Sequence, residues 1–157
     1  MVCYSCTMDI KNIIFDLGGV LLDIDYNLTV DAFQKLGIDP TYNQAVQESL
    51  FDDLEIGLID ELKFCDEIRR IYKADLLDKQ IIDAWNALLL HFPKERLQLL
   101  KEISEIYNIY LLSNTNEIHY RSYADTLKQD HGIDDFNGYF KKAYYSHEIN
   151  KRKPNVD

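Results

Sequence analysis

Residues 12–19 read Asn-Ile-Ile-Phe-Asp-Leu-Gly-Gly, a short apolar run that ends in the carboxylate of Asp16 and reaches two glycines after one leucine. Such a run, rich in β-branched and aromatic residues and without alternating polar positions, is typical of a buried strand in a parallel sheet. Open α/β sheets bind their ligands beyond the carboxyl ends of the strands. The pattern therefore predicts that Asp16 stands where a carboxylate can take part in chemistry.

A row of helices is predicted directly after this strand. Amphipathic segments cover residues 30–36, 42–54, 60–72 and 78–90. In the third segment Phe64, Ile68 and Ile71 recur at helical spacing. Asp60 is expected to be the N-cap of this segment, and Asp78 that of the fourth. Four amphipathic helices in succession predict a helical bundle inserted into the chain after the first strand.

An α/β pattern resumes at Pro93, which is expected in the first turn of the next helix. Buried strands are predicted at residues 106–112 and 143–145, and helices at residues 116–128 and 134–140. Helices that alternate with apolar strands predict an α/β fold with a parallel sheet. The inserted bundle is then expected to lie as a cap over the carboxyl ends of the strands.

Polar side chains stand at the end of each predicted strand. Asp16 ends the first, Ser113 and Asn114 end the second, and Lys153 lies in the loop after the third. A carboxylate can attack phosphorus, a hydroxyl and the N–H groups at a helix N-terminus can hold phosphoryl oxygens, and a lysine offsets negative charge. Each residue alone also has an ordinary explanation, as a turn residue, a helix cap or an exposed lysine. Together they indicate a phosphate site.

Three ordered motifs resemble those of the haloacid dehalogenase-like (HAD) hydrolase superfamily. They are Ile14-Phe-Asp-Leu-Gly-Gly-Val-Leu-Leu-Asp-Ile-Asp25, Leu111-Leu-Ser-Asn-Thr-Asn116 and Arg152-Lys-Pro154. Within the superfamily the chain is most similar to bacterial members of the alpha-D-glucose-1-phosphate phosphatase type, whose caps contain a Gly-x-Ile turn similar to that in residues 55–61. The resemblance extends from residue 10 to residue 155.

The resemblance implies a HAD-like, Rossmannoid parallel sheet with an inserted helical cap of the C1 type. The implied division is a discontinuous core domain of residues 8–22 and 93–157, a four-helix cap domain of residues 23–92, and a disordered tail of residues 1–7.

The resemblance also implies roles for individual residues. Asp16 is expected to be the nucleophile and a Mg²⁺ ligand, with the backbone carbonyl of Gly18 as a second ligand. Ser113 and Asn114 are expected to hold the phosphoryl group, and Lys153 to be the catalytic lysine. The implied activity is that of a Mg²⁺-dependent phosphatase of small phosphorylated metabolites, such as sugar phosphates, that works through an aspartyl-phosphate.

The chain departs from the family pattern in two places. Most family phosphatases carry a general-acid Asp two residues after the nucleophile, where this chain has Gly18. Without that acid we expect aryl phosphates or glucose 1-phosphate to be cleaved much faster than simple alkyl phosphates. The acidic fourth motif of the family, which completes its Mg²⁺ site, does not occur before Asp157, and three of five or more expected strands are present. We therefore expect a truncated form of a longer protein, or one that needs a partner, with self-association through the unpaired edge of the first strand.

Two other functions fit parts of the pattern. One is a catalytically incompetent fragment or phosphate-binding module that keeps the phosphate site without the metal site. The other is a 2-haloacid dehalogenase-type hydrolase, in which Asp16 attacks carbon and no metal is needed. That family usually has an aromatic residue near position 18 and an arginine from the cap region, and neither is evident.

The amino-acid composition limits the classes of partner that we expect the chain to bind. The chain has 157 residues, with 17 Lys and Arg against 27 Asp and Glu, which gives a net charge of −10. This charge repels phosphate backbones and anionic membranes, so we expect a small phosphorylated substrate and neither nucleic acid nor a membrane surface as partner. No apolar run is long enough for a membrane span and residues 1–8 do not read as a secretory signal, so a cytoplasmic location is expected.

The remaining candidate side chains are expected to be structural. Cys3 and Cys6 are interpreted as part of a frayed tail rather than half of a zinc site, and Cys65 as a core residue. Trp85, on an apolar helical face, is also assigned to the core rather than to a sugar-binding platform. The four histidines are expected at the surface or in helix caps; they are His91, His119, His131 and His147.

Overall fold

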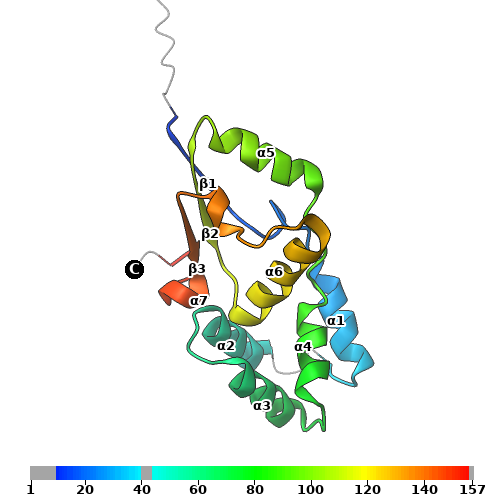
Figure 1. Ribbon diagram of the computed structural model, residues 1–157. Helices are drawn as coiled ribbons and strands as arrows, with labels where there is room; N and C mark the ends of the chain where they lie inside the picture. Colours follow the sequence, from blue (N-terminus) through cyan, green and yellow to red (C-terminus); the bar gives the residue numbers. More distant parts are fainter. Residues whose placement is uncertain (1–9, 40–43, 156–157) are drawn as a thin grey trace, which may run out of the picture.

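A computed structural model describes residues 10–39 and 44–155 (Figure 1). Its sheet has three parallel strands in the order β1-β2-β3, which are β1 (Asn12–Phe15), β2 (Asn108–Ser113) and β3 (Lys142–Tyr145). Phe15 lies opposite Leu111 and Ser113 opposite Tyr145, so the three strands end at one edge of the sheet. The predicted parallel sheet is confirmed, and with it the convergence of the strand ends.

Helices surround the sheet in two groups. The described helices are α1 (Tyr26–Lys35), α2 (Gln44–Glu55), α3 (Glu61–Tyr72), α4 (Asp78–Asn86), α5 (Lys94–Ser104), α6 (Glu117–His131), the 3-10 turn η1 (Asn137–Tyr139) and α7 (Ser146–Ile149). Figure 1 shows α1 to α4 gathered beyond the carboxyl ends of the strands, near the point where β2 leads into α6, whereas α5 lies toward the opposite end of β2. The α/β architecture with a helical insertion after the first strand is therefore as predicted.

Two apolar clusters correspond to these groups. The first packs around the sheet and includes Leu17, Leu22, Leu100, Leu111, Leu127 and Tyr145. The second lies among α1 to α4 and includes Phe33, Leu54, Phe64, Cys65, Ile68, Ile81 and Trp85, together with Ile118 from α6. Cys65 and Trp85 are buried, as predicted. The clusters support our proposed division into a core of residues 8–22 and 93–157 and a cap of residues 23–92.

The ends of α1 and α4 differ from the prediction. α1 begins at Tyr26, four residues before the predicted start at Val30, because Asp25 is its N-cap and accepts a hydrogen bond from the N–H of Asn27 at 2.9 Å. The N-cap of α4 is Leu77, not Asp78 as predicted. Asp78 lies 2.6 Å from Arg69 in an ion pair instead.

α4 also ends at Asn86, before the predicted residue 90. The segment after it pairs with the chain that enters the cap: Asp25 donates its N–H to the carbonyl of Leu88 and Leu90 donates to the carbonyl of Asp23, at 2.9 and 3.0 Å. These backbone bonds take residues 88–90 out of the helix and join the two segments that connect the cap to the core.

The remaining helix ends agree with the prediction only in part. Asp60 is the N-cap of α3, as predicted, and accepts from Lys63 N–H at 2.8 Å. Pro93 is the N-cap of α5 rather than a residue of its first turn. Asn116 caps α6, so Ser113 and Asn114 are not caps of this helix. The helix predicted at residues 134–140 is reduced to η1.

Within the described residues, β1 has a strand partner on one side only. Ile14 on this strand is 65 % exposed. None of the described helices combines the length and the apolar character that a membrane crossing requires. The predicted tail, including Cys3 and Cys6, lies outside the described residues.

Candidate active site

Asp16 and Lys153 are brought together at the carboxyl end of the sheet. Asp16 follows β1, and Lys153 follows α7 in the loop after β3. The ammonium of Lys153 lies 2.7 Å from Oδ2 of Asp16 and donates to the carbonyl of Leu112 at 2.8 Å. Oδ1 of Asp16 accepts the N–H of Leu17 at 2.8 Å. The carboxylate is thereby oriented by the backbone N–H of the next residue and neutralised by the lysine.

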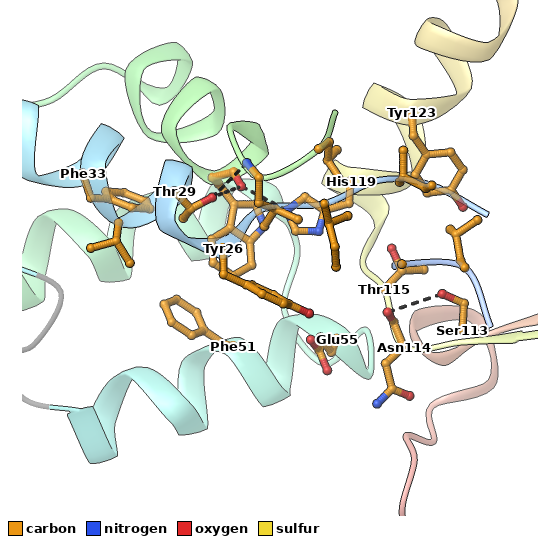
Figure 2. Close-up of a pocket in the computed structure, with 18 residues that line it drawn as sticks. Tyr26, Thr29, Phe33, Phe51, Glu55, Ser113, Asn114, Thr115, His119 and Tyr123 are labelled. Atoms are coloured by element: carbon orange, nitrogen blue, oxygen red, sulfur yellow. Dashed lines mark hydrogen bonds between the residues drawn. The ribbon is translucent and has the colours of Figure 1, made fainter. Parts of the chain in front are cut away.

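Asn114 fixes the lysine loop from the end of β2. Its side-chain amide donates to the carbonyl of Lys153 and its Oδ1 accepts the N–H of Lys153, both at 2.9 Å. The neighbouring hydroxyl of Ser113 is buried and lies 3.4 Å from the carbonyl of Asn114, to which it donates (Figure 2). The predicted residues are therefore close together, and the Asn114 amide holds the loop that carries Lys153.

A cavity of about 530 Å³ opens between the sheet edge and the helical cap (Figure 2). Gly18, Ser113 and Asn114 line it from the core side. Its cap side is mainly aromatic and aliphatic, with Tyr26, Phe33, Phe51 and Trp85 among the lining residues. Asp16 and Lys153 are not lining residues, but Leu17 next to Asp16 is. The cavity therefore offers room for a small molecule next to Asp16.

The cap is attached to the lysine loop through the turn after α2. The guanidinium of Arg152 pairs with the carboxylates of Asp52 and Glu55. The side-chain amide of Asn150 donates to the carbonyl of Ile56 at 2.7 Å. At Gly57, which has φ of +70°, a Cβ atom would lie 2.4 Å from the carbonyl oxygen of His147. Glycine at this position therefore permits the cap turn and the loop to touch.

His119 is buried between α6 and α4, so its predicted surface or capping position is wrong. Asn116 accepts the backbone N–H of His119 through Oδ1 at 3.0 Å and donates from Nδ2 to Nδ1 at 3.1 Å. This network assigns the ring proton to Nε2, which donates to the carbonyl of Trp85 at 3.2 Å. Burial lowers the pKa of His119 to about 4, although the bond to Trp85 opposes the shift. The imidazole is therefore neutral near pH 7 and connects core to cap.

His147 is also less exposed than predicted. Only 7 % of its side chain is exposed, and its Nε2 lies 3.3 Å from a carboxylate oxygen of Glu117 at the start of α6. Across residues 10–39 and 44–155, no group of three or more His, Cys, Asp and Glu side chains is placed to hold a metal ion.

Comparison with known proteins identifies the family to which the chain belongs. No family model matches the chain. A D-ribitol-5-phosphate phosphatase from Bacteroides thetaiotaomicron is 31 % identical over 148 residues, which are 92 % of this chain and 71 % of that protein. A HAD family enzyme of the same organism is 36 % identical, and the match covers 72 % of that enzyme. The chain belongs to the HAD family of hydrolases. This agrees with the resemblance noted in the three motifs.

Solved HAD structures superpose on most of the chain. A HAD family enzyme from B. thetaiotaomicron, crystallised as a magnesium complex, has a TM-score of 0.84 and 36 % identity and covers 92 % of this chain and 72 % of its own. The same enzyme with magnesium and inorganic phosphate has a TM-score of 0.75 at 36 % identity, covering 92 % of this chain and 73 % of its own. The HAD-like fold assigned from the motifs is thus confirmed.

Several cavity residues were not predicted as site residues. Tyr26 directly follows the first motif, at the hinge into the cap, and sequence alone favours a solvated turn residue there rather than a substrate contact. Phe51 follows no chemical motif, and the folded cap brings it to the cavity. Glu55 lies in residues 55–61, the stretch whose Gly-x-Ile turn resembles that of the family caps, and this resemblance was the available signal for a role of Glu55 at the site. Trp85 is a core residue, as predicted, but it also lines the cavity.

Proposed function

We propose that the chain is a phosphatase of small phosphorylated metabolites, with sugar or sugar-alcohol phosphates as substrates. The observation that carries this proposal is the 2.7 Å contact between Asp16 and Lys153 beside a cavity lined by Ser113 and Asn114. The name of the D-ribitol-5-phosphate phosphatase relative supports the substrate class.

In the proposed reaction a carboxylate oxygen of Asp16 attacks phosphorus. The bond between phosphorus and the ester oxygen breaks, the electron pair leaves with that oxygen, and water supplies its proton because Gly18 offers no acid. Water then attacks the aspartyl-phosphate, the bond between phosphorus and Asp16 breaks, and inorganic phosphate leaves. Lys153 offsets the charge that accumulates beside Asp16 in both steps.

Mg²⁺ fits this proposal through the chemistry of its donors. Proteins often bind it through one or two carboxylates together with phosphate oxygens and water, and Asp16 and the carbonyl of Gly18 are donors of that kind. Bound there, the ion would supply positive charge to the phosphoryl oxygens. The magnesium complexes of the HAD structures support this assignment.

The test is release of inorganic phosphate from D-ribitol 5-phosphate with and without Mg²⁺. We expect Mg²⁺-dependent release by the chain and none by Asp16→Asn. Asp83→Asn is the matched control, because Asp83 is an exposed carboxylate of α4 that forms an ion pair with Lys79 on the same helix. Asp83→Asn should retain full activity. Tight binding of phosphate without any hydrolysis would instead favour a phosphate-binding module.

A further inference from the structure

Ser146 is the first residue of α7 and directly follows β3. It is 2 % exposed, although its side chain is polar. Its hydroxyl donates to the carbonyl of Thr115 at 2.7 Å and accepts the N–H of the same residue at 2.9 Å. Neither backbone segment can shift without leaving a buried polar group unpaired, which is unfavourable. The end of β3 is thereby fixed to the segment that follows β2.

The backbone of Ser146 also holds the start of the loop that carries Lys153. Its carbonyl accepts the N–H of Asn150, the residue that caps α7, and the N–H of Lys151 at 3.3 Å. Asn150 has φ of +54°, a left-handed conformation that asparagine adopts more readily than most residues. The chain therefore leaves the short helix while it is still bonded to Ser146.

The far end of this loop is held by the residue next to Thr115. Asn114 donates to the carbonyl of Lys153 and accepts its N–H, both at 2.9 Å. Residues 146–153 are therefore attached at both ends to two successive residues of the segment after β2. Ser146 provides one attachment with its own side chain, and Asn114 provides the other.

The position of the Lys153 ammonium depends on these attachments. The ammonium lies 2.7 Å from Oδ2 of Asp16 and 2.8 Å from the carbonyl of Leu112, and 35 % of the lysine side chain is exposed. A flexible four-carbon stem with a partly exposed end relies on its backbone for a fixed position. A displacement of about 1 Å in an active site can lower a rate by about 10²-fold. Movement of the loop would therefore matter at Asp16.

We infer that Ser146 is a positioning residue that fixes the lysine loop to the end of β2 and thereby keeps the ammonium of Lys153 beside Asp16. Ser146 is buried and does not line the cavity, so it acts through Lys153 and not on the substrate. The inference rests on the proposed function for its effect on rate. Its effect on Lys153 is measured without any substrate.

The first measurement is the rate at which acetic anhydride acetylates Lys153, followed by mass spectrometry of the peptide that contains it. An amine bound to a carboxylate and a carbonyl reacts more slowly than a released one. In Ser146→Ala we expect Lys153 to react about 2- to 5-fold faster, the factor expected for loss of a partly exposed ion pair. Lys79 of α4 pairs with Asp83 and is the internal reference, which should react equally in both chains.

Leu100→Ala controls for a general loss of stability, because Leu100 is fully buried on α5. It should leave the ratio of Lys153 to Lys79 acetylation unchanged. An unchanged ratio in Ser146→Ala, or an equal rise in Leu100→Ala, overturns the inference.

Ser146→Cys is the second variant, because a thiol is close in size to the hydroxyl but is a weak donor and acceptor. It should raise the ratio in the same direction as Ser146→Ala, by a smaller factor. If Ser146→Ala does not fold, an unchanged ratio in Ser146→Cys overturns the inference. Loss of folding in both variants also overturns it, because Ser146 would then serve the fold and not the lysine.

Hydrolysis of D-ribitol 5-phosphate with Mg²⁺ separates this inference from the proposed function. We expect Ser146→Ala to lower kcat by about 10- to 10²-fold and to change KM little, because the lysine moves while the cavity is kept. Full activity of Ser146→Ala, beside an active unaltered chain, would overturn the inference alone. No hydrolysis by the unaltered chain, together with faster acetylation of Lys153 in Ser146→Ala, would overturn the proposed function and support the role of Ser146 in positioning the lysine.

Discussion

The imidazole of His119 stacks on the indole of Trp85, with ring centroids 5.0 Å apart and ring planes inclined by 15°. The contact joins α6 of the core to α4 of the cap and adds to the hydrogen bond from Nε2 to the Trp85 carbonyl. Because burial holds the pKa of His119 at about 4, below its ordinary value of 6.5, the stability of this contact depends on pH.

This shift predicts a loss of stability in acid. The unfolded chain takes up a proton at His119 near pH 6.5, whereas the folded chain resists protonation until about pH 4. The contribution of neutral His119 is therefore fully present above pH 6.5 and is lost as the pH falls toward 4. Between pH 7 and pH 5 we expect the free energy of unfolding to fall by about 2 kcal/mol from this residue.

Urea unfolding at both pH values measures this effect. His119→Gln removes the titrating ring, so its free energy of unfolding should fall less between pH 7 and pH 5 than that of the unaltered chain. His131→Gln, at the end of α6, is the control and should keep the original dependence. Equal dependence in His119→Gln and the unaltered chain would contradict the assignment.

The position of His119 also shows what the sequence could and could not predict. Apolar periodicity and strand-end residues predicted the sheet, α3 with its Asp60 cap, and the meeting of Asp16 with Lys153, because each depends on local pattern or on sheet geometry. The burial of His119 depends on a contact between core and cap, which local pattern does not encode.

The same limit applies to helix ends. Tyr26 and Leu28 in the first turn of α1 are exposed, so this turn does not continue a buried apolar face, and Asp25 decides where the helix starts. The early end of α4 follows from backbone pairing with residues 23–25, which are distant in sequence.

Gly57→Ala should destabilise the docking of the cap. The substitution forces an alanine into φ of +70° and places its Cβ 2.4 Å from the carbonyl oxygen of His147. Gly37→Ala is a matched control, because Gly37 has φ of +78° but no atom within 4 Å of the added Cβ. Gly37→Ala should cost about 1–2 kcal/mol of conformational strain, and Gly57→Ala clearly more.

The difference between these two variants can be read from urea midpoints. Binding of D-ribitol 5-phosphate should also weaken in Gly57→Ala and remain unchanged in Gly37→Ala, because only the first lies against the lysine loop. Similar midpoints for the two variants would show that the cap turn moves freely away from the loop.

Gly18→Asp tests the absence of a general acid. The unaltered chain should hydrolyse phenyl phosphate much faster than n-pentyl phosphate, since the pentanol oxygen needs a proton as it leaves. The added Cβ would lie 3.1 Å from Cδ1 of Ile24, the end of a flexible side chain, so the substitution can be accommodated by a small shift. Gly18→Asp should increase kcat/KM for n-pentyl phosphate by about 10²-fold. This would narrow the difference between the rates on phenyl phosphate and n-pentyl phosphate.

Gly18→Asn controls for size in this comparison, because asparagine has the same shape without a transferable proton. Steady-state rates of phosphate release provide the measurement. Equal rates of the unaltered chain on phenyl and n-pentyl phosphate would show that leaving-group protonation is not limiting.

The open edge of β1 predicts self-association. In the part of the chain that the structure describes, β2 is the one strand paired with β1, and an edge that carries an exposed apolar residue such as Ile14 favours pairing with another strand. Sedimentation velocity of the chain should show concentration-dependent dimers or larger species. Ile14→Lys should shift the distribution toward monomer, whereas Leu99→Lys, at an exposed position on α5, should not. A monomer at all concentrations would contradict this prediction.

Arg152 and Lys153 are successive residues that contact different parts of the molecule. Arg152 pairs with the α2 carboxylates of the cap, and Lys153 pairs with Asp16 of the core. A cap movement that opens the cavity must therefore either break the Arg152 ion pairs or displace the loop that carries Lys153. Since salt screens partly exposed ion pairs, rising ionic strength should weaken the Arg152 pairs and, under the proposed function, speed product departure. Under the proposed function, the electrostatic attachment of the cap would thus determine how long the reaction products remain enclosed.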